Sequence, residues 1–300
     1  MTSMFMPKGI IAAMVTAWNE DESLNEREIR NQVNRQIAAG VDAVFCLGTN
    51  GEFYIQSQEE KLRVMEIVVS EAAGRVPVYA GTGCVGTKET IALSQKAKEI
   101  GADVLSVISP YFAAISQTEL YMHYATVAAA VDLPIVMYNM PARTGNNLAP
   151  ETVARLADIP NIVGVKDSSG NWENLKAYID ATRGKEFRVL SGNDSLILPT
   201  LKEGGAGGIT AVANIYPKTM VSIYQNFIKG DLAAAEAAQN SIAPIRACFK
   251  FGNPNTVTKK ATNLRGYPVG PCRAPFQYLS EEAVAAIAEV IRSDEAKGMA

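Results

Sequence analysis

The chain has 300 residues, of which 48% are hydrophobic and 20% charged, enough to bury the core of one large domain. Its net charge is -3 and its longest basic run is Lys259-Lys260, which excludes an electrostatic nucleic-acid binder, while no apolar stretch is long enough to span a membrane. We therefore expect small molecules, or further copies of this chain, as partners.

Histidine and cysteine usage limits the chemistry further. The only histidine, His123, stands inside a predicted helix, so a multi-histidine metal site is excluded and a Ser-His-Asp triad has one candidate base. We expect His123 to be a surface or packing residue, and we predict no metal site. The cysteines lack C-x-x-C spacing and no signal pattern opens the chain, which predicts reduced thiols and a cytoplasmic location; they are Cys46, Cys84, Cys248 and Cys272.

Short β-branched runs alternate with helical segments, a pattern typical of strand-helix units around a parallel sheet. The predicted strands cover 10–15, 43–47, 76–80, 104–108, 135–138, 162–166, 188–191 and 208–212. The predicted helices cover 25–39, 58–73, 88–100, 117–131, 150–156, 172–181, 195–203 and 217–228. Eight such units predict an α/β fold, a closed (β/α)₈ TIM barrel rather than an open doubly wound sheet.

The alternation ends near Lys229, and three further helices are predicted over 231–246, 256–264 and 280–292. We predict a catalytic barrel over residues 1–229 and a C-terminal helical extension packed on it over 230–300. Nucleotide-binding folds lose support because no Gly-x-Gly-x-x-Gly follows the first strand and no P-loop lysine motif occurs.

The end of the second strand offers a candidate anion site, because functional groups of such barrels stand at the carboxyl ends of the strands. The chain reads Leu47-Gly48-Thr49-Asn50-Gly51-Glu52 there. Gly48 lets backbone N–H groups approach an anion, while Thr49 and Asn50 offer further donors, as a 2-oxo acid carboxylate requires. A plain turn into the next helix would also use glycine and small polar residues.

The ends of the fifth and sixth strands carry the candidate reactive groups. Tyr138 places a phenol where it can pass protons to and from a carbinolamine, and the fork of Arg143 suits a second carboxylate. Lys166 ends a buried strand, where an ammonium ion is costly but a neutral amine can form a Schiff base. The alternatives are a packing tyrosine, a surface arginine and a lysine that snorkels to solvent. Adjacent parallel strands lie about 4.8 Å apart, so Tyr138 and Lys166 can act on one substrate carbon.

The seventh and eighth strands end in Ser191-Gly192-Asn193-Asp194 and Gly207-Gly208-Ile209-Thr210. Glycine-rich ends keep this side of the barrel mouth open, and backbone groups around Gly192 and Ile209 are candidate substrate contacts. We expect Asp194 to cap the next helix.

These motifs together, in this order and spacing, resemble those of the dihydrodipicolinate synthase and N-acetylneuraminate lyase family, nearest to the synthase. The resemblance covers nearly the whole chain, from about Gly9 to Asn253-Pro254 and Arg273-Ala274-Pro275. It implies a class I, Schiff-base lyase that acts on pyruvate or another 2-oxo acid without metal or organic cofactor. It also implies a homotetramer built from two tight dimers.

The resemblance further implies residue roles. Lys166 matches the Schiff-base lysine, Tyr138 the proton-relay tyrosine, and Thr49 the relay hydroxyl. Thr49 and Asn50 occupy the loop that binds the pyruvate carboxylate. Arg143 matches the arginine that binds the carboxylate of aspartate semialdehyde in the synthase branch, and the lyase branch lacks it.

Three positions depart from the synthase pattern. Asn50 stands where the synthases usually have a second threonine, although its amide can still donate to a carboxylate. Phe112 stands where the family has a tyrosine that reaches across a dimer interface as the third relay hydroxyl, and phenylalanine cannot relay a proton. Either Tyr111 or water substitutes, or the substrate differs. Val85 replaces an asparagine of lysine-inhibited synthases, which argues against feedback control by lysine.

Three functions follow as hypotheses. The first is a synthase that condenses pyruvate with an aldehyde, 4-hydroxy-tetrahydrodipicolinate synthase with aspartate semialdehyde as the aldehyde. The second is an aldolase or dehydratase of a 2-oxo-3-deoxy sugar acid or a similar hydroxy 2-oxo acid, which Phe112 and Asn50 favour. The third is a non-catalytic 2-oxo acid binding protein that retains the barrel.

Overall fold

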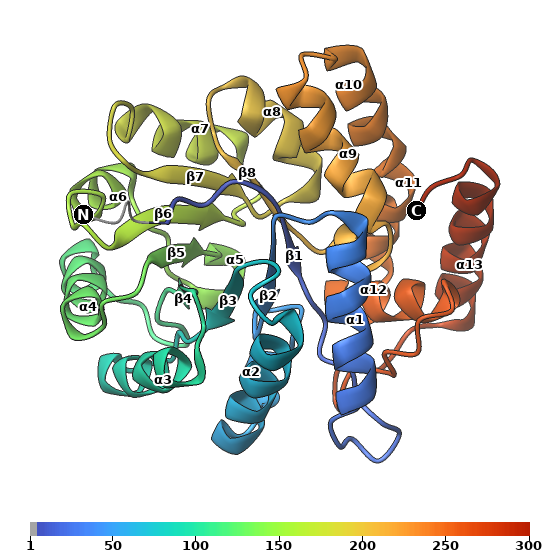
Figure 1. Ribbon diagram of the computed structural model, residues 1–300, viewed down its shortest axis with the longest axis horizontal. Helices are drawn as coiled ribbons and strands as arrows, with labels where there is room; N and C mark the ends of the chain where they lie inside the picture. Colours follow the sequence, from blue (N-terminus) through green and yellow to red (C-terminus); the bar gives the residue numbers. More distant parts are fainter. Residues whose placement is uncertain (1–4) are drawn as a thin grey trace. The chain divides into compact units, whose positions relative to one another are not determined.

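The computed structural model describes residues 5–300, in which eight parallel strands follow one another around a closed barrel (Figure 1). The strands are β1 (Gly9–Ala13), β2 (Ala43–Cys46), β3 (Val78–Gly81), β4 (Val104–Ile108), β5 (Ile135–Asn139), β6 (Ile162–Asp167), β7 (Arg188–Ser191) and β8 (Gly207–Thr210). Each lies within two residues of its predicted bounds. The predicted (β/α)₈ fold is therefore confirmed.

Helices fill the segments between the strands and continue beyond the last one. They are α1 (Glu26–Ala39), α2 (Gln58–Ala72), α3 (Thr87–Ile100), α4 (Gln117–Ala130), α5 (Pro141–Thr144), α6 (Pro150–Leu156), α7 (Trp172–Ala181), α8 (Ile197–Lys202), α9 (Pro217–Ile228), α10 (Leu232–Ser241), α11 (Ala243–Ala247), α12 (Pro254–Leu264) and α13 (Glu281–Ala296). The helix predicted over 231–246 is divided into α10 and α11, because the ring nitrogen of Pro244 cannot donate to a carbonyl one turn back. The short α5, between β5 and α6, was not predicted.

Side chains fix the starts of several helices. At α2, Ser57 Oγ accepts a hydrogen bond from the Glu60 amide at 3.2 Å, and the Glu60 carboxylate accepts one from the Ser57 amide at 2.9 Å, which is a capping box. The cap predicted at Asp194 is wrong. Asn193 accepts the hydrogen bond from the Ser195 amide at 3.1 Å, and Asp194 is the buried first residue of a 3₁₀ helix that precedes α8.

The described chain divides into two compact units. The β3–β8 unit comprises residues 5–9 and 79–209, and the β1–β2 unit comprises residues 10–78 and 210–300. Inside the β3–β8 unit the strands pair in sequence, so Ile108 lies opposite Tyr138, and Tyr138 lies opposite Lys166. Inside the β1–β2 unit, Ile11 of β1 lies opposite Ala43 of β2.

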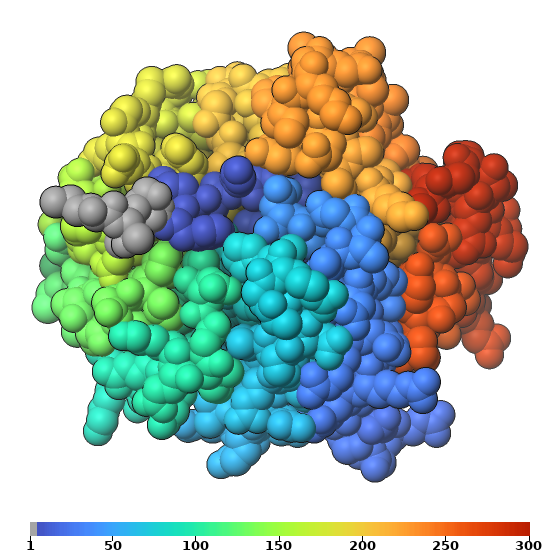
Figure 2. Space-filling model, in the orientation of Figure 1, coloured from blue at the N-terminus to red at the C-terminus, as the bar shows by residue number. Residues whose placement is uncertain are grey.

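Helices α9 to α13 belong to the β1–β2 unit. Helix α10 packs on α9, and α12 packs on α13 (Figure 1). The same C-terminal chain forms the orange to red surface in Figure 2. Tyr216, just before α9, donates to the buried carboxylate of Asp294 in α13 at 3.0 Å. The boundary predicted between residues 229 and 230 falls directly after α9, and the separate helical extension stays a prediction.

Two further findings concern residues 5–300. No helix in that range is both long and apolar enough to cross a membrane. Nor does that range gather three or more His, Cys, Asp or Glu side chains into a group that could hold a metal ion.

The single histidine is a packing residue of the β3–β8 unit. His123 lies on α4 and is 5% exposed, and its Nδ1 is 2.9 Å from the Thr87 hydroxyl at the start of α3. Its ring meets the Tyr124 ring edge-on at a centroid distance of 5.3 Å. Burial lowers the pKa of His123 to about 4, because the imidazolium would lose its hydration. The packing role expected of this residue is confirmed.

We predict that His123 makes the protein lose stability as the pH falls from about 6.5 to about 4. In that window the unfolded chain binds a proton at His123 while the folded chain does not, so acid favours unfolding. The wild-type melting temperature should therefore fall more steeply between pH 7 and pH 4.5 than that of His123→Gln. Parallel curves for the two proteins would contradict this.

Candidate active site

Lys166 and Tyr138 form the centre of the candidate site at the carboxyl ends of β6 and β5. The pairing of the two strands places them directly opposite one another. The Lys166 Nζ lies 3.9 Å from the centroid of the Tyr138 ring, and the two residues are 4% and 3% exposed. The alternative of a lysine that snorkels to solvent is therefore wrong. The phenol of Tyr138 donates to Met140 Sδ at 3.0 Å.

A polar pair directly after these residues fixes their register. Asn139 donates to Asp167 Oδ1 at 2.8 Å, and the Leu148 amide donates to Asn139 Oδ1 at 3.0 Å. Asp167 also accepts from the hydroxyl of Ser169 at 2.6 Å and the amide of Asn174 at 3.1 Å. Burial raises the pKa of Asp167, and these hydrogen bonds oppose that rise. Sequence reasoning missed Asn139 and Asp167, although both follow a candidate residue immediately.

Because Gly192 has no side chain, the Lys166 side chain has room beside it. A Cβ at Gly192 would lie 2.9 Å from Lys166 Cε, 1.9 Å from Ser168 Oγ and 3.0 Å from the Asp167 carbonyl oxygen. The Gly192 amide donates to that same carbonyl at 2.7 Å. The structure thus brings Gly192 into contact with the predicted nucleophile. Ile209, on β8, is buried, and its backbone contact with substrate stays a prediction.

Arg143 lies on α5, four residues after the end of β5. Its side chain is exposed, and among residues 5–300 it has no hydrogen bond or ion pair. A guanidinium without an acidic partner is available to a carboxylate of a ligand. A surface arginine without a role in binding would be exposed in the same way, so the binding role of Arg143 stays a prediction.

Phe112 and Tyr111 follow β4 and differ in burial. Phe112 is 97% exposed, and its backbone has φ of +80°, a conformation that a bulky residue adopts only at an energetic cost. Tyr111 is half-buried, and burial raises the pKa of its phenol. Phe112 therefore presents an aromatic ring outward from the β3–β8 unit.

The predicted carboxylate loop belongs to the β1–β2 unit and follows β2. Gly48 is required because a Cβ there would lie 2.7 Å from the ring of Phe45. Thr49 and Asn50 are half-buried, and the Asn50 amide reaches the Ala13 carbonyl oxygen at 3.4 Å. Leu47 and Glu52, at the two ends of the loop, both have positive φ, +60° and +57°. The loop is a strained turn, not a relaxed connection.

The fold and the buried lysine-tyrosine pair define a lyase built on a (β/α)₈ barrel. The chain belongs to the dihydrodipicolinate synthetase family, whose model matches residues 6–294. Members of this family are pyruvate-dependent lyases, so the chain is an enzyme of that class. The family resemblance seen in the motifs is confirmed.

Known relatives cover nearly the full length of the chain. A 4-hydroxy-tetrahydrodipicolinate synthase of Methanospirillum hungatei is 39% identical over 95% of this chain and 99% of its own length. An uncharacterized DapA-like lyase of Halobacterium salinarum is 40% identical over 93% of this chain and 91% of its own. The crystal structure of YagE, a prophage protein of this family from E. coli K12 in complex with pyruvate, matches with a TM-score of 0.92 and 33% identity. That match covers 96% of this chain and 98% of YagE.

We predict that Gly192→Ala lowers both the stability of the protein and the reactivity of Lys166. The new methyl group overlaps Ser168 Oγ and crowds Lys166 Cε, and such overpacking typically costs about 1–3 kcal/mol. The melting temperature should fall, and borohydride trapping of pyruvate on Lys166 should slow at least about tenfold.

The double variant Gly192→Ala with Ser168→Ala separates the two effects. It removes the closest overlap but keeps the crowding of Lys166, so stability should recover more than reactivity. A single variant with wild-type melting and wild-type trapping would show that Gly192 has no such role.

Proposed function

We propose that this chain is a Schiff-base synthase that condenses pyruvate with aspartate semialdehyde, a 4-hydroxy-tetrahydrodipicolinate synthase. The observation that carries the proposal is the buried Lys166 amine, 3.9 Å from the centre of the Tyr138 ring, at the mouth of a barrel of this family. The named synthase among the relatives supports the same reaction.

In the proposed mechanism, the Lys166 amine adds to the ketone carbon of pyruvate. The carbinolamine then loses water to form an iminium ion, and this requires proton delivery to the departing hydroxyl. We assign this delivery to Tyr138, and we assign Thr49 as the second relay hydroxyl. The iminium withdraws electrons from the adjacent methyl group, which loses a proton to give an enamine. The enamine carbon then attacks the aldehyde carbon, and the aldehyde oxygen takes up a proton. This step regenerates the iminium, and attack on it by the product's own amino group, or by water, breaks the bond to Lys166 and releases the product.

The two carboxylates of the reaction need separate partners. We assign the pyruvate carboxylate to the Gly48-Thr49-Asn50 loop, where backbone and side-chain donors are close together in sequence. We assign the carboxylate of aspartate semialdehyde to Arg143, because its guanidinium is exposed and has no acidic partner among residues 5–300. Gly192 and Ile209 supply backbone contacts in this proposal.

A second candidate function rests on Phe112 and Asn50. Phe112 brings no hydroxyl to the position where the family has a relay tyrosine, and Asn50 replaces a threonine. An aldolase or dehydratase of a 2-oxo-3-deoxy sugar acid, or of a similar hydroxy 2-oxo acid, would need the same Lys166 and Tyr138 with a different relay. Tyr111 is the phenol next to Phe112 that could replace the missing hydroxyl. A non-catalytic 2-oxo acid binding protein is the third candidate.

We also propose that the chain assembles as a homotetramer of two tight dimers and works in the cytoplasm. The exposed ring and strained backbone of Phe112 support a contact with a second copy, because strain of this kind persists where surrounding structure holds it. Among residues 5–300 none of the four cysteines forms a disulfide, which supports a reducing compartment.

We predict that borohydride in the presence of pyruvate attaches one reduced pyruvyl group to Lys166. Peptide mass spectrometry locates the adduct. Lys166→Ala and Lys166→Arg should both abolish it, because neither side chain can form the imine, while Arg retains the positive charge. A wild-type protein that gives no adduct would overturn the enzymatic proposal and leave the binding protein as the better account.

We predict that Arg143→Ala raises the KM for aspartate semialdehyde by about tenfold to a hundredfold, the usual effect of losing a hydrogen-bonded charge. The KM for pyruvate should change little, and Arg143→Lys should recover part of the loss. Arg183→Ala, which removes an exposed arginine of the same unit, is the matched control. Wild-type cleavage of a 2-oxo-3-deoxy sugar acid, without activity on aspartate semialdehyde, would favour the second candidate.

A further inference from the structure

The carboxylate loop is held by a helix that lies more than two hundred residues away in sequence. Leu47 and Glu52 have positive φ without being glycine, and such conformations persist only where other contacts fix them. Within the loop, the Glu52 amide donates to the Thr49 carbonyl at 3.0 Å. The Gly51 carbonyl accepts from the Thr16 hydroxyl at 2.7 Å and from the Gln56 amide at 2.6 Å. These bonds come from the segment that follows β1, from the loop itself and from the residues just after it.

Asn255, in the first turn of α12, adds a direct bond to the reactive part of the loop. Its buried amide nitrogen donates to the Thr49 carbonyl oxygen at 2.7 Å and to the Tyr54 hydroxyl at 3.0 Å. Both hydrogens of the amide are therefore used. The bond to Thr49 fixes the peptide between Thr49 and Asn50, the two residues assigned to the pyruvate carboxylate.

Lys259, one helical turn after Asn255, holds the far end of the loop. Its Nζ lies 2.6 Å from Glu52 Oε1, and the two side chains are 1% and 0% exposed. Glu52 also accepts from the Trp18 indole at 3.1 Å and from the Arg273 amide at 3.0 Å. Burial lowers the pKa of Lys259, and the charge of Glu52 opposes that effect. Lys259 and Glu52 form a buried ion pair, so loss of one partner leaves an uncompensated charge.

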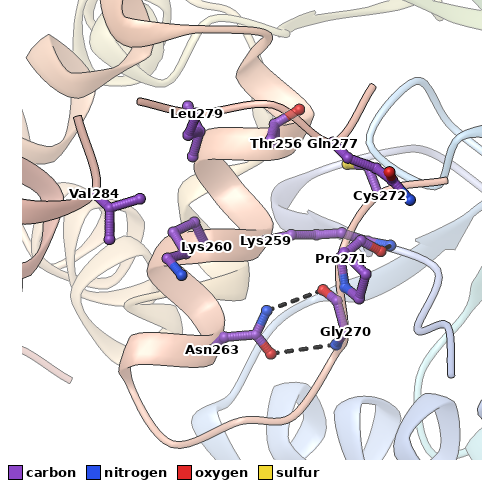
Figure 3. Close-up of a pocket in the computed structure, with 10 residues that line it drawn as sticks. All are labelled: Thr256, Lys259, Lys260, Asn263, Gly270, Pro271, Cys272, Gln277, Leu279 and Val284. Carbon is purple, nitrogen blue, oxygen red and sulfur yellow. Dashed lines mark hydrogen bonds between the residues drawn. The ribbon is translucent and has the colours of Figure 1, made fainter. Parts of the chain in front are cut away.

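The segment 270–272, which follows α12 and is called the strap here, completes the support of the loop. Lys259 donates to the Pro271 carbonyl at 2.9 Å, and Asn263 exchanges two hydrogen bonds with the Gly270 backbone, at 2.9 and 3.2 Å (Figure 3). The strap and α12 line a pocket of about 420 Å³. Residues 255, 259 and 263 are four apart, so they lie along one side of the helix. The side chains of Asn255 and Lys259 contact the loop, whereas the Asn263 side chain bonds only to the strap.

We propose that Asn255 and Lys259 are positioning residues for the reaction, which hold the Thr49-Asn50 peptide and Glu52 in the geometry that binds the pyruvate carboxylate. This inference rests on the proposed function, because it takes the loop to be the carboxylate site. Helix α12 thus contributes to substrate affinity although it follows the last strand of the barrel.

The test is borohydride trapping on full-length protein, with the adduct on Lys166 measured against pyruvate concentration. Asn255→Ala should raise the half-saturating concentration about three- to tenfold, because the loop loses one buried hydrogen bond. The amount of adduct at saturating pyruvate should stay near the wild-type value, since Lys166 and Tyr138 are untouched. Asn263→Ala is the matched control on the same helix, and it should leave half-saturation unchanged even if it lowers the melting temperature.

The ion pair needs a paired substitution, because Lys259→Met alone leaves Glu52 charged and buried. The double variant Lys259→Met with Glu52→Gln removes both charges and should also raise half-saturation without reducing the saturating amount of adduct. An unchanged half-saturation in Asn255→Ala would overturn the inference, as would an equal rise in Asn263→Ala. Absence of any adduct in the wild-type protein would instead overturn the proposed function, and this inference with it.

Discussion

The register between β5 and β6 is the constraint on which the candidate site depends. Side chains alternate between the two faces of a strand, so a slip of one residue would turn either Tyr138 or Lys166 away from the other. The hydrogen bond from Asn139 to Asp167, one position further along both strands, makes such a slip costly. Gly164 of β6 allows β7 to pair closely with β6, because a Cβ at Gly164 would lie 2.6 Å from the Arg188 carbonyl oxygen of β7.

The Tyr138-Lys166 pair and the loop after β2, which we assign to the reaction, are each supported by a buried carboxylate that has hydrogen-bond or ion-pair partners. In the β3–β8 unit, Asp167 is bonded to amide and hydroxyl donors next to the lysine. In the β1–β2 unit, Glu52 is bonded to Lys259 and to the indole of Trp18. Burial without partners would cost several kcal/mol for each charge, so these networks make the local backbone rigid as long as they stay intact. Rigidity of this kind suits groups that must meet a substrate in one geometry.

The sequence allowed much of this to be predicted, and the misses have physical reasons. Strands were located because β-branched runs are conspicuous, and Lys166 because an ammonium at the end of such a run is costly to bury. The break between α10 and α11 was missed although Pro244 signals it. Asn139 and Asp167 lie one residue beyond the predicted ends of their strands, since nothing local distinguishes a polar residue that continues a strand from one that follows it. Asn255 could not be predicted, because its partner Thr49 lies 206 residues away.

The long separation between Asn255 and Thr49 has a consequence for the order in which the protein is completed. Contacts distant in sequence form late, since the intervening chain must first be confined. As the ribosome synthesises the chain, Lys166 and Tyr138 are made well before α12, and their strands can pair without it. The loop after β2 receives its last hydrogen bonds only when the residues around 255 to 273 have been added. A nascent chain thus contains Lys166 and Tyr138 before it contains the residues that support the loop after β2.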